Sequence, residues 1–347
     1  MNNDPGKNEI AEPPAPAAPV LSQSKHSAPL RRFFGAQDVS DLDALVFEAL
    51  EAKENPYKDE NLGKRKTLGL FFMNPSLRTR VSTEKAGRNL GMDVQIINAG
   101  SDAWALEFDE GAVMNSNRVE HVRDAAPVLG SFFDIIGLRC FPGLIDRDKD
   151  YNEQVFNSFA KFSGAPILSL ESATRHPLQS LADLITIKEH SAKAGKAKPK
   201  VVLTWAPHIK PIPQAVGNSF AEWMIASGAD FTITNPEGYD LAPEFTKGAK
   251  IEHNQAKALE GADFVYVKNW SSFTDYGKVF EGGREWMLTE SHFAKAPDAK
   301  VMHCLPLRRN VELSDEILDG PRSLLTELAA NRLWAAQAVL RRMLLSL

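Results

Sequence analysis

Cysteine, long apolar runs and excess positive charge are all scarce in this sequence of 347 residues. The two cysteines, Cys140 and Cys304, cannot build a disulfide framework, and such sparse use is typical of a reducing cytoplasm. No stretch reaches the roughly 18 consecutive apolar residues that a membrane-spanning helix needs. The formal net charge of −5 offers no basic surface to nucleic acid or to an anionic membrane. We therefore expect a cytoplasmic protein with neither nucleic acid nor membrane as a partner.

Several motifs of cofactor and metal chemistry are also missing. No strand-like segment is followed by Gly-x-Gly-x-x-Gly, which argues against a nicotinamide dehydrogenase. The Gly-x4-Gly-Lys frame of a nucleotide-binding P-loop is absent as well. The histidines show no ligand spacing, and His303-Cys304 has no partner ligands nearby in the sequence. We expect neither a metal site nor a cofactor.

What is present describes an ordinary globular chain with one unusual end. Hydrophobic residues make up 43% and charged residues 24% of the sequence, and its length is sufficient for two domains. The Pro/Ala-rich run from Glu12 to Pro19 offers too little apolar surface to fold, and nothing near it resembles a secretory signal. We predict a disordered Pro/Ala-rich tail over residues 1–30.

The most informative stretch joins a strand to a helix at Asn74-Pro75-Ser76-Leu77-Arg78-Thr79-Arg80. The apolar run 67–73 before it is typical of a buried strand in a parallel sheet. Helical periodicity begins at Ser76, and Gly91 stands where a helix end is expected. Free N–H groups at a helix start, together with hydroxyls and a guanidinium, can bind phosphate oxygens. On these residues alone, an N-cap serine with solvated arginines remains the simpler alternative.

Apolar segments that fit strands alternate with helical patterns along the rest of the chain. We predict helices at 41–53, 121–129, from about 180 onward, and at 324–347. We predict further strands at 92–98, 132–139, 165–170, 201–205, 231–234 and 264–268, and a last strand that is followed by Met302-His303-Cys304-Leu305-Pro306. This alternation is typical of parallel α/β sheets. We therefore predict an α/β protein of two halves with a cleft between them.

Four separated motifs carry a resemblance to a known family. Arg139 ends a predicted strand, His176-Pro177-Leu178-Gln179 follows another, and His303-Cys304-Leu305-Pro306 follows the last. With Ser76-Leu77-Arg78-Thr79, this set resembles the carbamoyltransferase family, whose members carry Ser-x-Arg-Thr, His-Pro-x-Gln and His-Cys-Leu-Pro in this order. The resemblance begins near Arg31 and continues to the C-terminus.

The resemblance implies a fold, a donor and an assembly. The fold would be α/β, with two doubly wound parallel-sheet domains joined by interdomain helices and the active site in the cleft. Residues 31–175, completed by the helix 324–347, would bind carbamoyl phosphate, and residues 176–323 would bind the acceptor. The protein would be a homotrimer with active sites shared between subunits.

The resemblance also assigns roles to single residues. The catalytic residues would be Arg139 and His176, which polarise the carbonyl oxygen, with Gln179 and Cys304, which hold the carbamoyl NH₂. Carbamoyl phosphate would contact Ser76, Leu77, Arg78, Thr79, Trp104, Arg139, His176, Pro177, Leu178, Gln179, Cys304, Leu305 and Arg332. Taken singly, His176 could be a loop residue and Arg139 could pair with a nearby carboxylate; it is the joint occurrence that favours the catalytic reading.

The acceptor is indicated by what this chain lacks. The aspartate and the Ser-Met-Gly loop of ornithine enzymes are absent, and Lys268 offers a partner for the α-carboxylate of an N-acylated ornithine instead. The loop Asp102-Ala103-Trp104 lacks the lysine of aspartate enzymes. The chain is similar to the branch that carbamoylates N-acylornithines. By that resemblance the acceptor would contact Val119, Glu171, His208, Lys268, Cys304, Leu305 and Arg308.

The acyl group is indicated by Val119 and Arg308. By resemblance, acetylornithine enzymes hold a glutamate at the position of Val119, which would repel a succinyl carboxylate, whereas Arg308 can bind that carboxylate bidentately. Glu312 departs from the acetylornithine enzymes, which by resemblance carry a lysine there; it could also be a capping or solvated carboxylate. We expect carbamoyl transfer to the side-chain amine of N2-succinyl-L-ornithine, giving N-succinyl-L-citrulline and phosphate in arginine biosynthesis. An N-acetylornithine enzyme and a non-catalytic homologue remain the alternatives.

Overall fold

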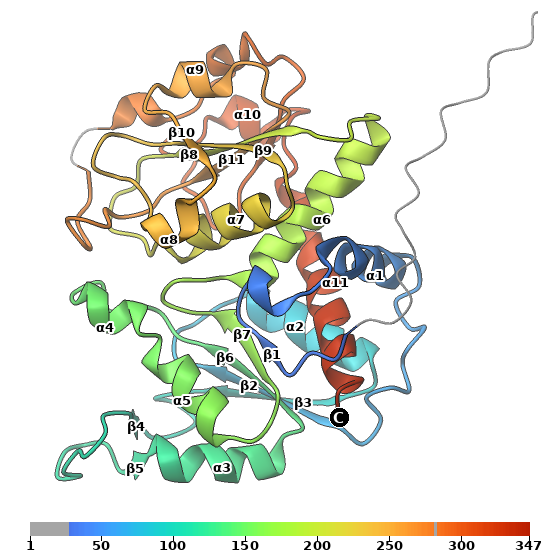
Figure 1. Ribbon diagram of the computed structural model, residues 1–347, viewed down its shortest axis with the longest axis vertical. Coiled ribbons are helices and arrows are strands. Elements are labelled where there is room, and N and C mark those ends of the chain that lie inside the picture. The colour runs from blue at the N-terminus through green and yellow to red at the C-terminus, as the bar shows by residue number, and fades with distance from the viewer. Residues whose placement is uncertain (1–27, 281–282) are drawn as a thin grey trace, which may run out of the picture.

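The computed structural model describes residues 28–280 and 283–347 and contains two five-stranded parallel sheets (Figure 1). The first sheet consists, in spatial order, of β1 (Arg32–Phe33), β7 (Ile167–Glu171), β6 (Ile135–Arg139), β2 (Thr67–Phe72) and β3 (Asp93–Asn98). The second consists of β10 (Lys250–Ile251), β9 (Asp230–Thr234), β8 (Lys200–Trp205), β11 (Phe264–Lys268) and β12 (Lys300–Met302). A small pair joins β4 (Leu106–Glu107) to β5 (Glu120–His121).

Helices follow most of the strands. Those of the N-terminal half are α1 (Leu42–Glu54), α2 (Arg78–Asn89), α3 (Val122–Phe132), α4 (Arg147–Tyr151) and α5 (Gln154–Phe162). The later ones are α6 (Pro177–Lys193), α7 (Ala215–Ala226), α8 (Pro243–Thr246), α9 (Gln255–Leu259), α10 (Asp315–Asp319) and α11 (Leu325–Leu344). Short 3-10 turns occur at Ala36–Asp38, Arg284–Trp286 and Glu290–Phe293.

The first sheet is covered on both faces, as its continuous apolar strands require. In β2, Phe71 packs with residues of α3 and α5 on one face. Its neighbours Leu70 and Phe72 point to the other face and join the cluster that includes α2 and α11. Successive side chains of β2 therefore pack into two separate apolar clusters, one on each face of the sheet, and both faces are protected from water.

Two long helices connect the sheets. Helix α6 leaves the first sheet after β7 and leads into β8 of the second sheet, and α11 returns from the second sheet to pack on α2 and α6 (Figure 1). One apolar cluster runs through these helices and reaches both sheets. The predicted α/β fold with two doubly wound sheets and connecting helices is confirmed.

Some predicted boundaries were wrong. The helix predicted to end at 129 continues to Phe132, so the strand predicted from 132 begins only at Ile135. We expected the helix after β7 to begin near Ser180, but α6 begins at Pro177 with His176 as its N-cap. Proline is well suited to the first helical position, because its missing N–H would have no partner there and its φ is already helical. The His-Pro-Leu-Gln motif is thus the first turn of a helix, which fixes the direction of Gln179.

Gly91 ends α2 through a close backbone approach. Its φ is +83°, and a Cβ at this position would lie 2.0 Å from the carbonyl oxygen of Glu60. Only glycine can occupy such a site without moving the neighbouring chain. The predicted helix end at this glycine is therefore confirmed, and its cause is tertiary as well as local.

The two ends of the described chain lie side by side. Leu30 is buried in the main core, and its carbonyl oxygen accepts a hydrogen bond from Ser346 Oγ at 3.3 Å. Most of the predicted tail, residues 1–27, lies outside the described residues. Among the described residues, no helix has the length and apolarity needed to cross a bilayer.

Candidate functional site

Residues at the carboxyl ends of the strands in both sheets line a common cavity. In the first sheet the strand order reverses between β2 and β6, and the register places Phe72 opposite Arg139 at the carboxyl ends. In the second sheet the order reverses between β8 and β11, where Trp205 lies opposite Lys268. Ligand crevices of open α/β sheets form at such reversal points. Here both reversal points contribute to one cavity.

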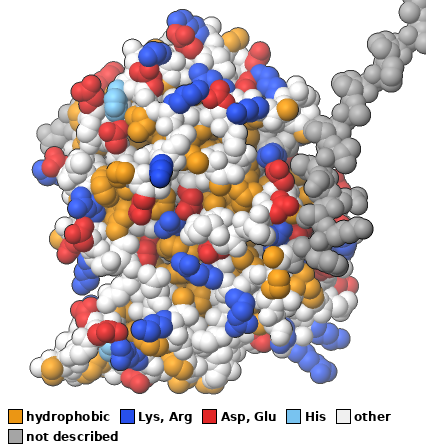
Figure 2. Space-filling model, viewed as in Figure 1, with side chains coloured by type: hydrophobic (Ala, Val, Ile, Leu, Met, Phe, Trp, Pro, Cys, Tyr) orange, Lys and Arg blue, Asp and Glu red, His pale blue; other side chains and the backbone are white. Residues whose placement is uncertain are grey.

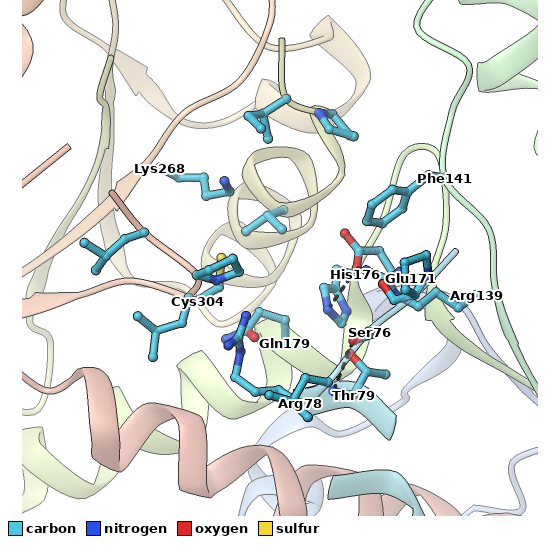
Figure 3. Close-up of a pocket in the computed structure, with 18 of the residues that line it drawn as sticks. Ser76, Arg78, Thr79, Arg139, Phe141, Glu171, His176, Gln179, Lys268 and Cys304 are labelled. Carbon is cyan, nitrogen blue, oxygen red and sulfur yellow. Dashed lines mark hydrogen bonds and ion pairs between the residues drawn. The ribbon is translucent and has the colours of Figure 1, made fainter. Parts of the chain in front are cut away.

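The cavity has a volume of about 660 Å³ and contains most of the predicted site residues. Figure 3 shows Ser76, Arg78, Thr79, Arg139 and Glu171 on one side and Lys268 and Cys304 on the other, with His176 and Gln179 of α6 between them. The predicted residues that line it are Ser76, Leu77, Arg78, Thr79, Arg139, Glu171, His176, Gln179, His208, Lys268, Cys304, Leu305, Arg308 and Arg332.

The strand-to-helix turn after β2 presents polar groups to this cavity. Ser76 Oγ accepts a hydrogen bond from the Thr79 N–H at 3.3 Å, and Arg78 is the first residue of α2. Arg332 reaches across from α11 and donates to Thr79 Oγ1. Partial burial lowers the pKa of Arg78, and full burial lowers that of Arg332. Both side chains stay cationic at neutral pH, because an arginine in a protein does not lose its proton.

Arg139 is held rigidly at the end of β6. Its Nη1 donates to the carbonyl oxygens of Asn74 and Pro75 at 2.9 and 2.6 Å, and its Nη2 donates to Glu171 Oε2 at 3.0 Å. The Phe141 ring lies 4.1 Å from the guanidinium carbon, a distance that fits a cation–π contact. The predicted ion pair with a nearby carboxylate exists, and Arg139 still lines the cavity.

His176 is a neutral imidazole in this environment. Burial lowers its pKa well below 6.5, and the positive charges of Arg332, Arg139 and Arg78 act in the same direction. Its Nε2 lies 3.4 Å from Arg332 Nη2 and 3.5 Å from Glu171 Oε2. Its Nδ1 has no hydrogen-bond partner among the described residues.

The opposite wall is built on β11 and on the turn after β12. Burial raises the pKa of the Cys304 thiol, so the side chain is a neutral thiol at neutral pH. The turn is fixed by His303, whose Nδ1 accepts a hydrogen bond from the Leu305 N–H at 2.9 Å. Leu305 has a φ of +54°, in the left-handed region, and its bond to Pro306 is cis. Leu305 and Pro306 line the cavity together with Lys268.

Glu312 is a structural part of this wall. It is buried, its Oε1 lies 3.4 Å from His303 Nε2, and its Oε2 accepts the Arg308 N–H at 2.7 Å. Burial opposes ionisation of Glu312, but the contact with His303 and the nearby Lys268 charge outweigh it and lower its pKa. The carboxylate thus ties the His303 turn to the segment that carries Arg308, and it is not solvated.

His208 lies in the loop after β8 at the cavity rim. Its Nδ1 contacts the backbone of Lys210, and partial burial lowers its pKa.

Four predicted contact residues are not among those lining the cavity. Leu178 points into the apolar core, and Pro177 serves as the first helical residue of α6. Trp104 is 59% exposed and donates from Nε1 to Glu120 Oε2 at 2.7 Å. Val119 is 67% exposed. Trp104 lines a second cavity, of about 790 Å³, between the 99–120 segment and the first sheet.

Sequence reasoning missed Phe141 and Lys210, which also line the main cavity. Phe141 stands two residues after Arg139, but no local pattern shows that its ring folds back over the guanidinium. Lys210 stands between prolines in the loop after His208, and such a surface lysine has no sequence signal of its own. Within the described part of the chain, no group of three or more His, Cys, Asp or Glu side chains is placed to hold a metal ion.

Comparison with known proteins assigns both halves of the chain to one family. The aspartate/ornithine carbamoyltransferase carbamoyl-P binding domain matches residues 31–189, and the Asp/Orn binding domain of the same family matches residues 213–343. The chain belongs to the aspartate/ornithine carbamoyltransferase family. The predicted family membership is confirmed, and with it the carbamoyltransferase class.

Relatives within this carbamoyltransferase family differ in their named acceptor. The N-succinylornithine carbamoyltransferase of Bacteroides thetaiotaomicron is 48% identical, over 91% of this chain and 99% of the relative. The N-acetylornithine carbamoyltransferase of Xanthomonas campestris pv. campestris is 35% identical over 90% and 97%. A crystal structure of an N-acetyl-L-ornithine transcarbamylase mutant, with one glutamate changed to valine, contains carbamyl phosphate and N-succinyl-L-norvaline. It has a TM-score of 0.84 and 35% identity, covering 90% of this chain and 99% of that one.

Proposed function

We propose that the protein transfers the carbamoyl group of carbamoyl phosphate to the side-chain amine of N2-succinyl-L-ornithine, in the cytoplasm and as a step of arginine biosynthesis. The products are N-succinyl-L-citrulline and phosphate. The observation that carries this proposal is the single cavity in which the phosphate turn, Arg139 and His176 face Lys268 and Arg308. The described cysteines are both free, which suits a reducing compartment.

The donor binds on the side of the first sheet. Ser76, Leu77, Arg78 and Thr79 surround the phosphate with hydroxyl, guanidinium and helix N-terminal N–H groups, and Arg332 adds a second guanidinium. The domain formed by 31–175 and the helix 324–347 is thus the carbamoyl-phosphate domain. The domain formed by 176–323 takes the acceptor.

The carbonyl oxygen of the donor gains negative charge as the amine attacks. Arginine is a donor only, so the Arg332 contact uses the lone pair of His176 Nε2 and leaves the imidazole proton on Nδ1. Nδ1–H has no described partner, and in this proposal it donates to that oxygen together with Arg139. One preorganised donor of this kind contributes about 3–4 kcal/mol to lowering the barrier. The Cys304 and Leu305 backbone and Gln179 hold the carbamoyl NH₂.

The acceptor binds on the side of the second sheet. Lys268 pairs with its α-carboxylate, Glu171 and His208 contact its backbone and amine, and Arg308 pairs with the succinyl carboxylate. The deprotonated amine forms the new C–N bond, the C–O bond to phosphate breaks, and the proton lost by nitrogen leaves with phosphate. Lys268 and Arg308 thus hold the two carboxylates of the acceptor, which orients its side-chain amine toward the carbonyl carbon of the donor.

The assembly is a homotrimer with shared active sites. Trp104 and Val119 are exposed and lie outside the cavity of their own chain, which is what residues supplied to a neighbouring subunit's site require. In that arrangement Trp104 contacts the neighbour's carbamoyl phosphate and Val119 contacts the neighbour's acyl group.

Val119 favours succinyl over acetyl. A neutral side chain leaves room for a second carboxylate, and a glutamate would repel it. The glutamate-to-valine mutant of an acetylornithine enzyme was solved with a succinyl ligand, which supports the same reading. A purely binding homologue is disfavoured, because the groups expected to stabilise the transition state, Arg139, His176 and Gln179, are all present.

The reaction is tested by following a labelled carbamoyl group. Purified protein is given ¹³C-carbamoyl phosphate and succinylornithine, and the products are identified by mass spectrometry. We expect labelled succinylcitrulline and phosphate in equal amounts. Phosphate release that does not depend on the acceptor would contradict the proposal.

A further inference from the structure

Gln179 lies between the carboxyl group of Asp183 and the guanidinium of Arg332, which can only donate hydrogen bonds. Its Nε2 donates to Asp183 Oδ1 at 2.8 Å, and its Oε1 accepts from Arg332 Nη1 at 3.0 Å. Gln179 and Asp183 are both fully buried and stand four residues apart, on the same side of α6. The side-chain amide therefore has one favourable orientation out of two.

Asp183 fixes this orientation from outside the cavity. It is not among the residues lining the cavity, and it lies one helical turn deeper along α6 than Gln179. Burial raises the pKa of Asp183 well above its usual value, but a carboxyl group keeps an acceptor oxygen in either protonation state. Gln179 is its hydrogen-bond partner at 2.8 Å, and the Tyr266 hydroxyl and the Arg332 charge, which also lower its pKa, act on it from the other sides.

The orientation of the Gln179 amide decides which of its polar atoms lies toward the cavity. An amide oxygen has two lone pairs, and Arg332 uses one of those on Gln179. Arg332 lines the cavity and Asp183 does not, so the oxygen end of the buried Gln179 amide, with its second lone pair, lies on the cavity side. The cavity thus meets a hydrogen-bond acceptor at this point, and the donating NH₂ end is turned away from it. A carbamoyl NH₂ satisfies such an acceptor, while the methyl group of an acetyl phosphate leaves it unpaired.

We propose that Asp183 is a positioning residue that locks the Gln179 amide and so makes the site select a carbamoyl over an acetyl phosphate. This inference rests on the proposed function and adds a specificity determinant to it. Asp183 does not line the cavity and acts on the ligand through Gln179. The hydrogen bonds continue from Gln179 to Arg332 and from Arg332 to Thr79. They connect the proposed binding place of the carbamoyl NH₂ to the phosphate turn.

The test compares three ligands by calorimetry: carbamoyl phosphate, acetyl phosphate and inorganic phosphate. Asp183→Leu removes the acceptor at similar volume. We expect it to weaken carbamoyl phosphate roughly five- to tenfold, with acetyl phosphate and inorganic phosphate changed less than about twofold. The ratio of the acetyl phosphate Kd to the carbamoyl phosphate Kd therefore falls toward one. A folded Asp183→Leu protein with the wild-type ratio would overturn the proposal.

Two further variants separate positioning from general damage. Asp183→Asn keeps an acceptor oxygen but no charge, so it should retain the wild-type ratio within about twofold; a folded Asp183→Asn protein whose ratio fell to one would also overturn the proposal. Thr186→Val removes a buried hydroxyl of α6 that bonds the Ala182 carbonyl and Asn331. It should lower the unfolding midpoint and leave the ratio unchanged. If wild-type protein binds no carbamoyl phosphate, the proposed function itself fails.

Discussion

Positive charge dominates the cavity at the scale of single residues. Six cationic side chains line it, namely Arg78, Arg139, Lys210, Lys268, Arg308 and Arg332, against two carboxylates, Glu171 and Glu312. The carboxylates are used within the protein, since Glu171 bonds Arg139 and Glu312 bonds the Arg308 backbone. The uncompensated cations suit a phosphate and an acceptor that brings two carboxylates. Elsewhere, charges of both signs are interspersed over the face seen in Figure 2.

Arg78 is the clearest residue to test, because its charge serves a ligand more than the fold. Its Nε has no hydrogen-bond partner among the described residues. We expect Arg78→Ala to lower kcat/KM for carbamoyl phosphate by roughly 100-fold or more, since it removes a preorganised donor to phosphate. The unfolding midpoint in urea should stay the same.

A matched control lies on the same helix. Arg88 pairs with Glu84 at 2.9 Å and is exposed. Arg88→Ala should therefore leave kcat/KM for carbamoyl phosphate unchanged and alter the free energy of unfolding by no more than about 0.5 kcal/mol. Wild-type turnover by a folded Arg78→Ala protein would remove the phosphate-site assignment.

The protonation of His176 can be observed directly. Burial and three neighbouring arginines lower its pKa well below 6.5, so the folded protein should hold it neutral at pH 6.0. An ordinary histidine is mostly protonated at that pH. The ¹⁵N shifts of the imidazole, assigned with a His176→Gln variant, report the charge. A titration midpoint near 6.5 would contradict the neutral donor assigned to this residue.

At the scale of elements, α11 holds the two halves of the protein together. It packs on α1, α2 and α6 and delivers Arg332 to the cavity. Ten residues further along, Arg342 forms a doubly hydrogen-bonded pair with Glu48 of α1, at 2.9 and 3.0 Å, and only 3% of its side chain is exposed. The next residue back, Arg341, pairs with Asp59 at 2.8 Å while 25% of its side chain is exposed.

These adjacent arginines predict different costs. Arg342→Met should lower the free energy of unfolding by about 3–5 kcal/mol, because it removes a largely buried, doubly hydrogen-bonded ion pair between α11 and α1. Arg341→Met should cost about 0–1 kcal/mol, because water replaces an exposed pair. Urea unfolding of both variants measures the contrast. Equal costs would mean that burial does not control the strength of the α1–α11 contact.

Elements with a clear apolar pattern could be predicted from the sequence, and those set by tertiary contacts could not. The strand 264–268 was predicted with the bounds of β11, because the four consecutive apolar or aromatic residues 264–267 stand between Asp263 and Lys268. The start of α6 was missed because the His-Pro-Leu-Gln motif was placed before the helix, whereas Pro177 is its first helical residue. The two-residue strand β1 has no pattern at all and exists only because it pairs with β7.

The same distinction applies to the candidate site. Motif residues such as Ser76, His176 and Cys304 were identifiable because their spacing resembles a family. Phe141 enters the site through a fold-back over Arg139, and Glu312 through burial against His303. No local sequence pattern predicts either contact.

At the scale of the whole molecule, the exposed residue Val119 connects the acyl choice to the assembly. Val119→Glu should lower kcat/KM for succinylornithine by roughly 10- to 100-fold and that for acetylornithine far less, because the new charge meets the succinyl carboxylate. Steady-state assays with both substrates measure the difference. Equal losses would mean that Val119 acts only through local contacts and would favour the acetyl reading.

Mixing subunits shows whether Val119 acts on its own chain or on a neighbour. Arg78→Ala and Val119→Glu proteins are unfolded together and refolded at equal concentrations. If sites are shared in a trimer, about a quarter of them combine two intact contributions and regain succinylornithine activity. No recovery in trimers of confirmed mixed composition would contradict the shared site.

We propose one cavity as the place where carbamoyl phosphate reacts with an N-succinylated ornithine. This proposal is tested most directly by measuring kcat/KM of the wild-type protein for ornithine, N-acetylornithine and N-succinylornithine side by side, with carbamoyl phosphate in excess. We predict the highest value for succinylornithine, a lower one for acetylornithine and no reaction with ornithine, whose charged α-amine would face Lys268. A preference for ornithine, or for acetylornithine over succinylornithine, would contradict the account.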